Sequence, residues 1–151
     1  MIQILNNEVN VMQDSNKDYS KFLWDVIDLM ANKFIILFIS SKKISINYKK
    51  SLKYKFDKDK IIIFEGSDYN DFIKILSELS DNCIHDFYVT INSSINTVKN
   101  FIEEKNDFMI DDYLKNFNKT IHITENGFDI DLDNFSTYAF QIERIVKRHE
   151  N

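Results

Sequence analysis

The chain has 151 residues, 44% of them apolar and 14% aromatic, which is enough apolar surface for one domain, so we treat residues 1–151 as a single globular unit. Charged residues make up 28% of the chain and the net charge is −5, a composition that excludes a membrane-spanning protein. Two glycines are too few for a phosphate-binding loop, which excludes the usual nucleotide-dependent enzymes, and a single cysteine without a signal-peptide pattern favours a cytoplasmic location.

The first half of the chain predicts one helix followed by strands. Apolar residues recur at helical spacing over 16–31. The short apolar runs 34–39 and 61–64 are typical of buried strands, whereas 43–48 and 52–56 alternate between apolar and polar residues, as half-exposed strands do. We therefore expect four strands in this half.

The second half alternates between helices and strands. Asp68 is suited to cap a helix over 68–80, and the Asn-Gly pair at 126–127 between alternating runs indicates a hairpin. The other predicted elements are a strand at 86–91, a helix capped by Ser93-Ser94, a helix near 109–117, hairpin strands at 120–124 and 128–132, and a helix at 134–148. A strand–helix–strand order over 61–91 suggests a right-handed crossover. The expected fold is α+β, with a mainly antiparallel sheet of five to seven strands packed with four or five helices.

A basic segment at 42–60 contains eight lysines and two aspartates. In the predicted strands the lysines lie on the face opposite the aromatic residues. A protein that binds DNA or RNA is expected to have arginines in its binding surface, and aromatic residues on the same face as its cations. The segment is therefore best interpreted as a solvated sheet face; binding of an acidic partner or of nucleic acid is the alternative.

An acidic segment follows, with nine carboxylates between residues 103 and 133 against three lysines. An acidic surface speeds the encounter with a basic protein and can occupy the places where substrate phosphates bind. The alternative interpretation is a solvated surface that maintains solubility. The residues predicted to bind a partner, with Tyr113 as their aromatic anchor, are Glu103, Glu104, Asp111, Asp112, Tyr113, Asp129, Asp131 and Asp133.

Catalytic, cofactor and metal patterns are weak. The spacing of Asp129, Asp131 and Asp133 resembles the start of a calcium loop, but Asn134 and Phe140 stand where that loop requires glycine and glutamate. We expect no metal and no cofactor. Cys83 and His85 lie too close in sequence for a typical nucleophile and base, and His122 is expected to be exposed.

The sequence favours a non-enzymatic protein-binding inhibitor. The hypothesis is a bacterial or phage immunity protein or antitoxin that blocks the active site of a basic toxin or nuclease effector. One alternative is a small hydrolase-type enzyme with a site around His85 or His122. Another is a nucleic-acid-binding accessory protein that uses the lysine-rich strands of 42–60.

Overall fold

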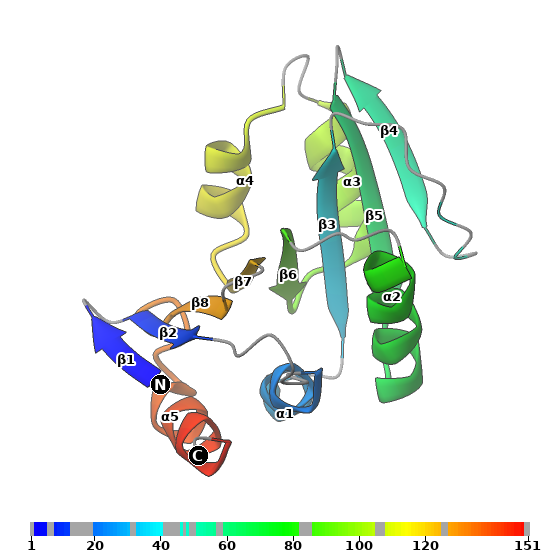
Figure 1. Cartoon of the computed structure of the whole chain (residues 1–151). Helices are drawn as coiled ribbons and strands as arrows, with labels where there is room; N and C mark the ends of the chain where they lie inside the picture. Colours follow the sequence, from blue (N-terminus) through cyan, green and yellow to red (C-terminus); the bar gives the residue numbers. More distant parts are fainter. Residues whose placement is uncertain are drawn as a thin grey trace.

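The computed structural model describes most of the chain in separate ranges. These are residues 2–5, 8–12, 20–30, 33–40, 46, 48, 51–56, 59–81, 86–104, 108–124 and 127–149. Figure 1 shows strands gathered in one sheet with helices packed around it. The α+β class and the antiparallel sheet predicted from the sequence are confirmed.

The sheet has eight strands within the described residues, in the order β1-β2-β8-β7-β6-β3-β5-β4. Each neighbouring pair is antiparallel. The strands are β1 Ile2–Leu5, β2 Glu8–Met12, β3 Phe34–Ser40, β4 Leu52–Phe56, β5 Asp59–Gly66, β6 Phe87–Ile91, β7 Thr120–Thr124 and β8 Gly127–Asp131.

Helices cover both faces of this sheet. On one face lie α1 Ser20–Met30, α2 Tyr69–Asp81 and α5 Ala139–Arg148, whose apolar residues belong to one buried cluster. On the other face, α3 Ile95–Glu103 and α4 Ile110–Asn116 pack over a second, smaller cluster. The sheet is therefore the middle layer of three.

Central strand β3 shows how the sequence builds two clusters. Successive side chains of a strand point to opposite faces. Phe34 and Ile36 accordingly face α1 and α2, whereas Ile35 and Leu37 face α3 and α4. The run is apolar throughout because both of its faces are buried.

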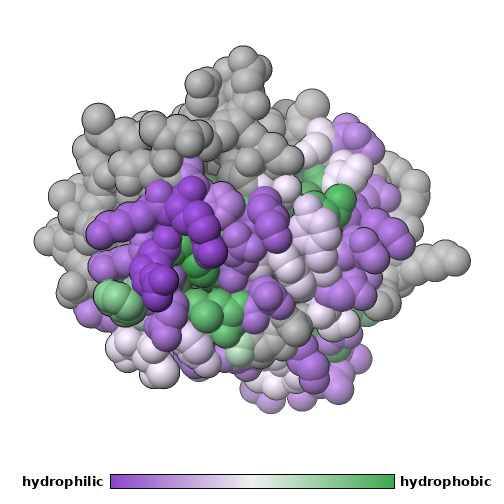
Figure 2. Space-filling view, turned by 90° about the horizontal axis from the view of Figure 1, so that it is seen from below, coloured by the Kyte–Doolittle hydropathy of each residue, from purple (hydrophilic) through white to green (hydrophobic). Residues whose placement is uncertain are grey.

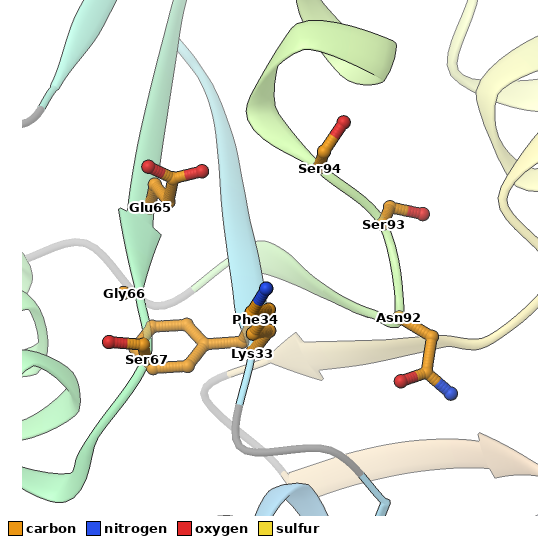
Figure 3. Close-up of a pocket in the computed structure, with 8 residues that line it drawn as sticks. All are labelled: Lys33, Phe34, Glu65, Gly66, Ser67, Asn92, Ser93 and Ser94. Carbon is orange, nitrogen blue, oxygen red and sulfur yellow. The ribbon is translucent and has the colours of Figure 1, made fainter.

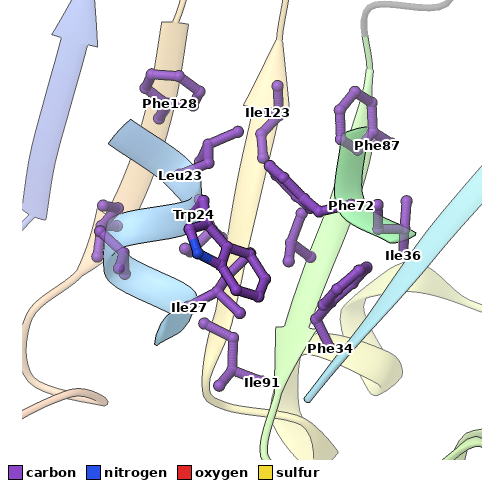
Figure 4. Packing of buried hydrophobic residues seen from close by; sticks show 14 of the residues in the cluster. Leu23, Trp24, Ile27, Phe34, Ile36, Phe72, Phe87, Ile91, Ile123 and Phe128 are labelled. Atoms are coloured by element: carbon purple, nitrogen blue, oxygen red, sulfur yellow. The ribbon is translucent and has the colours of Figure 1, made fainter. Parts of the chain in front are cut away.

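The larger cluster is rich in aromatic contacts (Figure 4). The ring of Phe72 on α2 meets the ring of Phe34 edge-on, with 5.3 Å between centroids, and Trp24 on α1 packs against both. Burial of each such side chain contributes about 1.5–3 kcal/mol. This contact network joins α1 and α2 to the sheet.

The strand–helix–strand unit predicted over 61–91 is present. Strands β5 and β6 both pair antiparallel with β3, which lies between them, so they run parallel to each other. Helix α2 makes the crossover, and its first turn is capped by Asp68, whose Oδ1 accepts a hydrogen bond from the Asp71 backbone N–H at 2.8 Å.

The structure differs from the predicted elements at both ends of the chain. Strands β1 and β2 were not predicted, and β2 extends the sheet by pairing with β8. The last helix begins at Ala139 instead of 134, because the preceding residues form turns. Of the predicted strand 43–48, only Ile46 and Tyr48 are described, and neither lies in a strand.

Among the helices in the described ranges, none combines the length and the apolar character needed to cross a membrane.

Candidate docking face

One sheet face carries a row of half-buried side chains beside the cluster of α3 and α4. Helices α3 and α4 cover the alternate residues of β3 and β5. On β6, β7 and β8, the positions on this same side are Tyr88, His122 and Asp129, which are half-buried and adjacent in the strand register. Their sequence neighbours, such as Val89 and Ile123, point to the opposite face and are buried. The strand alternation therefore places a polar row at the surface.

An aromatic pair forms the centre of this row. The imidazole of His122 stacks on the Tyr88 ring, with 4.4 Å between centroids and 12° between planes. The same imidazole has its Nε2 atom 2.5 Å from Oδ1 of Asp86. The side chain of Asp86 is 72% exposed and that of His122 is 32% exposed. The ring stacking and the contact with the Asp86 carboxylate hold the two rings in one orientation at the protein surface.

Carboxylates from distant segments surround the pair. The pKa of Tyr88 is raised, first by partial burial and then by the negative charges of Asp86 and Asp111. Asp111, in the first turn of α4, thus lies close enough to Tyr88 to act on it. Asp129 is paired with His122 across β7 and β8. We define the docking face as Asp86, Tyr88, Asp111, His122 and Asp129.

Two of the predicted residues lie where β8 ends: Asp131 is the last residue of the strand, and Asp133 is in the turn that follows. The Asp131 carboxylate accepts a hydrogen bond from the Asp133 backbone N–H at 3.0 Å and another from the Asn134 side-chain amide at 2.7 Å. Asp131 therefore has a local structural role. Asp133 is exposed in the turn. No group of three or more histidine, cysteine, aspartate or glutamate residues that could hold a metal ion occurs within the described ranges.

The remaining predicted carboxylates lie on α3 and α4. Glu103 and Glu104 are exposed at the C-terminal end of α3, and Asp112 is half-buried in the first turn of α4. They add negative charge to the side of the sheet that α3 and α4 cover. The residues that converge on the Tyr88–His122 pair are Asp86, Asp111 and Asp129.

Tyr113 does not fit its predicted role as a surface anchor, because its side chain is fully buried. On a short helix over a sheet, the apolar side must face the sheet, and Tyr113 is on that side. Its hydroxyl group hydrogen-bonds with the Thr90 hydroxyl on β6, and its ring lies 4.7 Å from the ring of Phe117. Burial raises the pKa of the Tyr113 phenol, although the Thr90 contact lowers it. Tyr113 therefore joins α4 to the sheet.

Sequence reasoning did not find Asp86 and Tyr88. The proximity of Asp86 to His122 depends on the pairing of β6 with β7, which are separated by two helices along the chain. Of the other predicted chemical groups, Cys83 and His85 lie outside the described residues. The lysine side chains of 42–60 lie outside them too, so the solvated-face interpretation stays a prediction.

A pocket of about 490 Å³ lies where β5 and β6 end and β3 begins. In Figure 3, Lys33 and Glu65 extend from neighbouring strands, and Ser93 and Ser94 lie across the gap at the start of α3. Ser94 caps α3, since its hydroxyl accepts a hydrogen bond from the Thr97 backbone N–H at 3.1 Å. The lining residues are Lys33, Phe34, Glu65, Gly66, Ser67, Asn92, Ser93 and Ser94, so the pocket contains no residue of the docking face.

Comparison of this chain with protein-family models, with curated proteins and with solved structures finds no match.

Proposed function

We propose that the chain is a non-enzymatic, protein-binding inhibitor, an immunity protein or antitoxin of bacterial or phage origin that acts in the cytoplasm. Its partner is a basic toxin or nuclease effector, and it blocks that effector's active site with the docking face. The observation that carries this proposal is the convergence of Asp86, Asp111 and Asp129 on the stacked Tyr88–His122 pair.

Electrostatics supports a basic partner. Carboxylates gathered on one face produce a negative potential that steers a positively charged protein into contact. The active site of a nuclease is built to bind phosphates, so carboxylates can occupy the same positions. The chain as a whole has a net charge of −5, which adds to this attraction.

The Tyr88 ring supplies an aromatic anchor in place of Tyr113. Interfaces obtain most of their binding energy from a few residues, and tyrosine is enriched among them. Stacking on His122 already fixes the Tyr88 side chain, so less rotamer entropy is lost when a partner covers it. A fixed aromatic group surrounded by carboxylates suits a basic surface with an apolar centre.

The test uses the effector that copurifies with the tagged chain from its native host. Association and dissociation rates are compared for the wild type, for Asp86→Lys/Asp129→Lys and for Tyr88→Ala. The matched control is Asp28→Lys/Asp81→Lys, which makes the same charge change at exposed positions on α1 and α2. We expect the docking-face reversal to slow association by about tenfold or more and the control to leave it within about twofold, because steering depends on where the charge lies. Tyr88→Ala should mainly speed dissociation.

Equal association rates for the two reversed variants would overturn the proposal, because the carboxylates of the docking face would then act through net charge alone. Both variants should remain folded, since carboxylates at exposed or half-buried surface positions contribute little to stability. A thermal melt of each variant checks this before the rates are compared.

The His122–Asp86 contact favours a second candidate, an acid–base enzyme. A carboxylate that orients an imidazole is the usual arrangement of a general base. However, Asp86 is largely exposed and neither residue lines the pocket, so the pair is not enclosed for chemistry. Hydrolysis of model esters that is lost in His122→Ala, together with unchanged effector binding by that variant, would support the enzyme over the inhibitor.

A further inference from the structure

Helix α5 carries an unusual set of exposed residues. The chain has 17 lysines and 2 arginines, and both arginines, Arg144 and Arg148, are on this helix. Phe140 and Lys147 share their side, because residues four, seven and eight positions apart lie on one face of a helix. All four are exposed. We define the basic stripe as Phe140, Arg144, Lys147 and Arg148.

The stripe combines an aromatic group with cations. Phe140 is 68% exposed, the most of any large hydrophobic residue within the described ranges, and the Arg144 guanidinium lies 5.9 Å from the centroid of its ring. Figure 2 shows strongly hydrophilic residues with small hydrophobic spots between them on the side where Figure 1 places α5. Arginine and aromatic residues are enriched in protein interfaces, and arginine binds carboxylates through two parallel hydrogen bonds.

The helix that carries the stripe is held firmly. Its opposite side buries Ile142, Ile145 and Val146 in the larger cluster. At its C-terminal end, Nε2 of His149 lies 2.9 Å from Oδ2 of Asp25 on α1. The helix backbone that carries the stripe is therefore fixed on the domain.

The stripe and the docking face lie on opposite sides of the sheet. Helix α5 packs on the side of Phe128 and Ile130, whereas Asp129, between them on β8, points to the other side. One molecule cannot bring its own stripe to its own docking face. The stripe of a second copy is free to reach that face. Its three cations, Arg144, Lys147 and Arg148, are complementary in charge to the three carboxylates of Asp86, Asp111 and Asp129.

We propose that the basic stripe of one copy binds the docking face of a second copy. The interface joins unlike surfaces, so every added copy leaves a free stripe at one end and a free docking face at the other, which gives short open chains or a ring. A single helical stripe forms a small contact, so the association is weak and sensitive to salt. The inference rests on the docking face defined above and requires no effector. Where an effector is present, it and the second copy compete for that face.

The test uses the purified full-length chain and sedimentation velocity. At an ionic strength of about 0.01 M, where the Debye length is about 30 Å, the sedimentation coefficient of the wild type should rise with concentration. At about 1 M, where that length is about 3 Å, the rise should disappear. Phe140→Ser should weaken the association at low salt, since it removes the apolar centre of the stripe.

A charge-swapped pair gives the sharpest readout. Arg144→Glu/Arg148→Glu makes the stripe acidic, and Asp86→Lys/Asp129→Lys makes the docking face basic. Each variant alone should stay monomeric. Mixed in equal amounts, they should associate and alternate along a chain, because the acidic stripe of the first fits the basic face of the second and the unchanged docking face of the first fits the unchanged stripe of the second. Asp28→Lys/Asp81→Lys, which leaves both surfaces unchanged, is the control and should self-associate as the wild type does.

A swapped pair that remains monomeric at low salt overturns the inference. So does binding of a single-stranded RNA oligonucleotide that is lost in Arg144→Glu/Arg148→Glu while no self-association occurs, because the stripe would then bind phosphates. Neither result contradicts the proposed function, which is tested separately by the rate of association with the effector. Arg144→Glu/Arg148→Glu leaves the docking face intact and should bind effector at the wild-type rate.

Discussion

Replacing Tyr113 distinguishes a buried support from a surface anchor. The Tyr113 ring is fully buried against Phe101, Phe108 and Phe117, with centroid distances of 6.2, 6.1 and 4.7 Å. Truncating such an aromatic ring to alanine costs about 3–5 kcal/mol, because it removes apolar contacts and leaves a cavity. Out of a total stability of about 5–15 kcal/mol, Tyr113→Ala should therefore remove a large share. At about 2–4 °C per kcal/mol for a chain of this size, the melting temperature should fall by roughly 6–20 °C.

Tyr113→Phe isolates the hydroxyl group. The Tyr113 hydroxyl contacts Thr90 Oγ1, which has a second neighbour in Thr120 Oγ1 at 3.4 Å. Thr90 therefore keeps one possible partner, and the loss should be about 1 kcal/mol, the usual net worth of one hydrogen bond. The melting temperature should fall by about 2–4 °C.

Urea unfolding and thermal melts of the wild type and both variants measure these changes, and effector dissociation is followed at a temperature where all three are folded. A Tyr113→Ala variant that is as stable as the wild type to within about 0.5 kcal/mol would refute the buried position. Faster dissociation with unchanged stability would restore Tyr113 as a surface anchor.

Three further predictions concern stability. Gly66→Ala should cost about 1–3 kcal/mol in a urea melt, because a Cβ at residue 66 would lie 2.3 Å from the Phe34 ring; a neutral result would mean that the ring moves freely. Ser94→Ala should cost about 1 kcal/mol by removing the N-cap of α3, whereas the neighbouring change Ser93→Ala should cost less; equal losses would argue against the cap. The raised pKa of Tyr113 means that the folded state favours the protonated phenol. The contribution of this group to the free energy of unfolding is therefore complete below the pKa of tyrosine in the unfolded chain, about 10, and is lost as the pH rises further. Unfolding free energy should fall there by about 1.4 kcal/mol per pH unit more in the wild type than in Tyr113→Phe, and parallel pH profiles would contradict this.

The central elements of the fold were predictable because their signals are local. The run 34–39 is apolar on both faces and became the strand buried on both faces. The Asn-Gly signal correctly predicted the hairpin of β7 and β8, in which Gly127 already pairs with Thr124. Gly127 has φ 146°, a conformation that favours glycine. The N-terminal strands escaped prediction because β2 is stabilised by pairing with β8, more than a hundred residues away.

For the candidate site, the sequence predicted that the surface is acidic but not which residues form it. A count of carboxylates between 103 and 133 included Asp111 and Asp129 but could not separate them from Asp131, whose carboxylate accepts hydrogen bonds within a turn. The burial of Tyr113 follows from which side of α4 faces the sheet, and a helix of seven residues has too few turns for a clear apolar period. Asp86 was missed because strand order, which brings it to His122, is a property of the assembled sheet.

The same long-range assembly has a consequence for binding. Asp86 precedes β6, Asp111 is on α4 and Asp129 is on β8, so a partner that contacts all three carboxylates bridges segments that separate when the sheet opens. Such a partner binds the folded chain and not the unfolded one. It therefore stabilises the whole domain by the linkage relation, about 2.7 kcal/mol at a partner concentration of 100 Kd. A partner bound to the contiguous residues 42–60 could retain contacts with the unfolded chain and would stabilise it less. Stabilisation by an effector thus reports which of the two charged surfaces it uses.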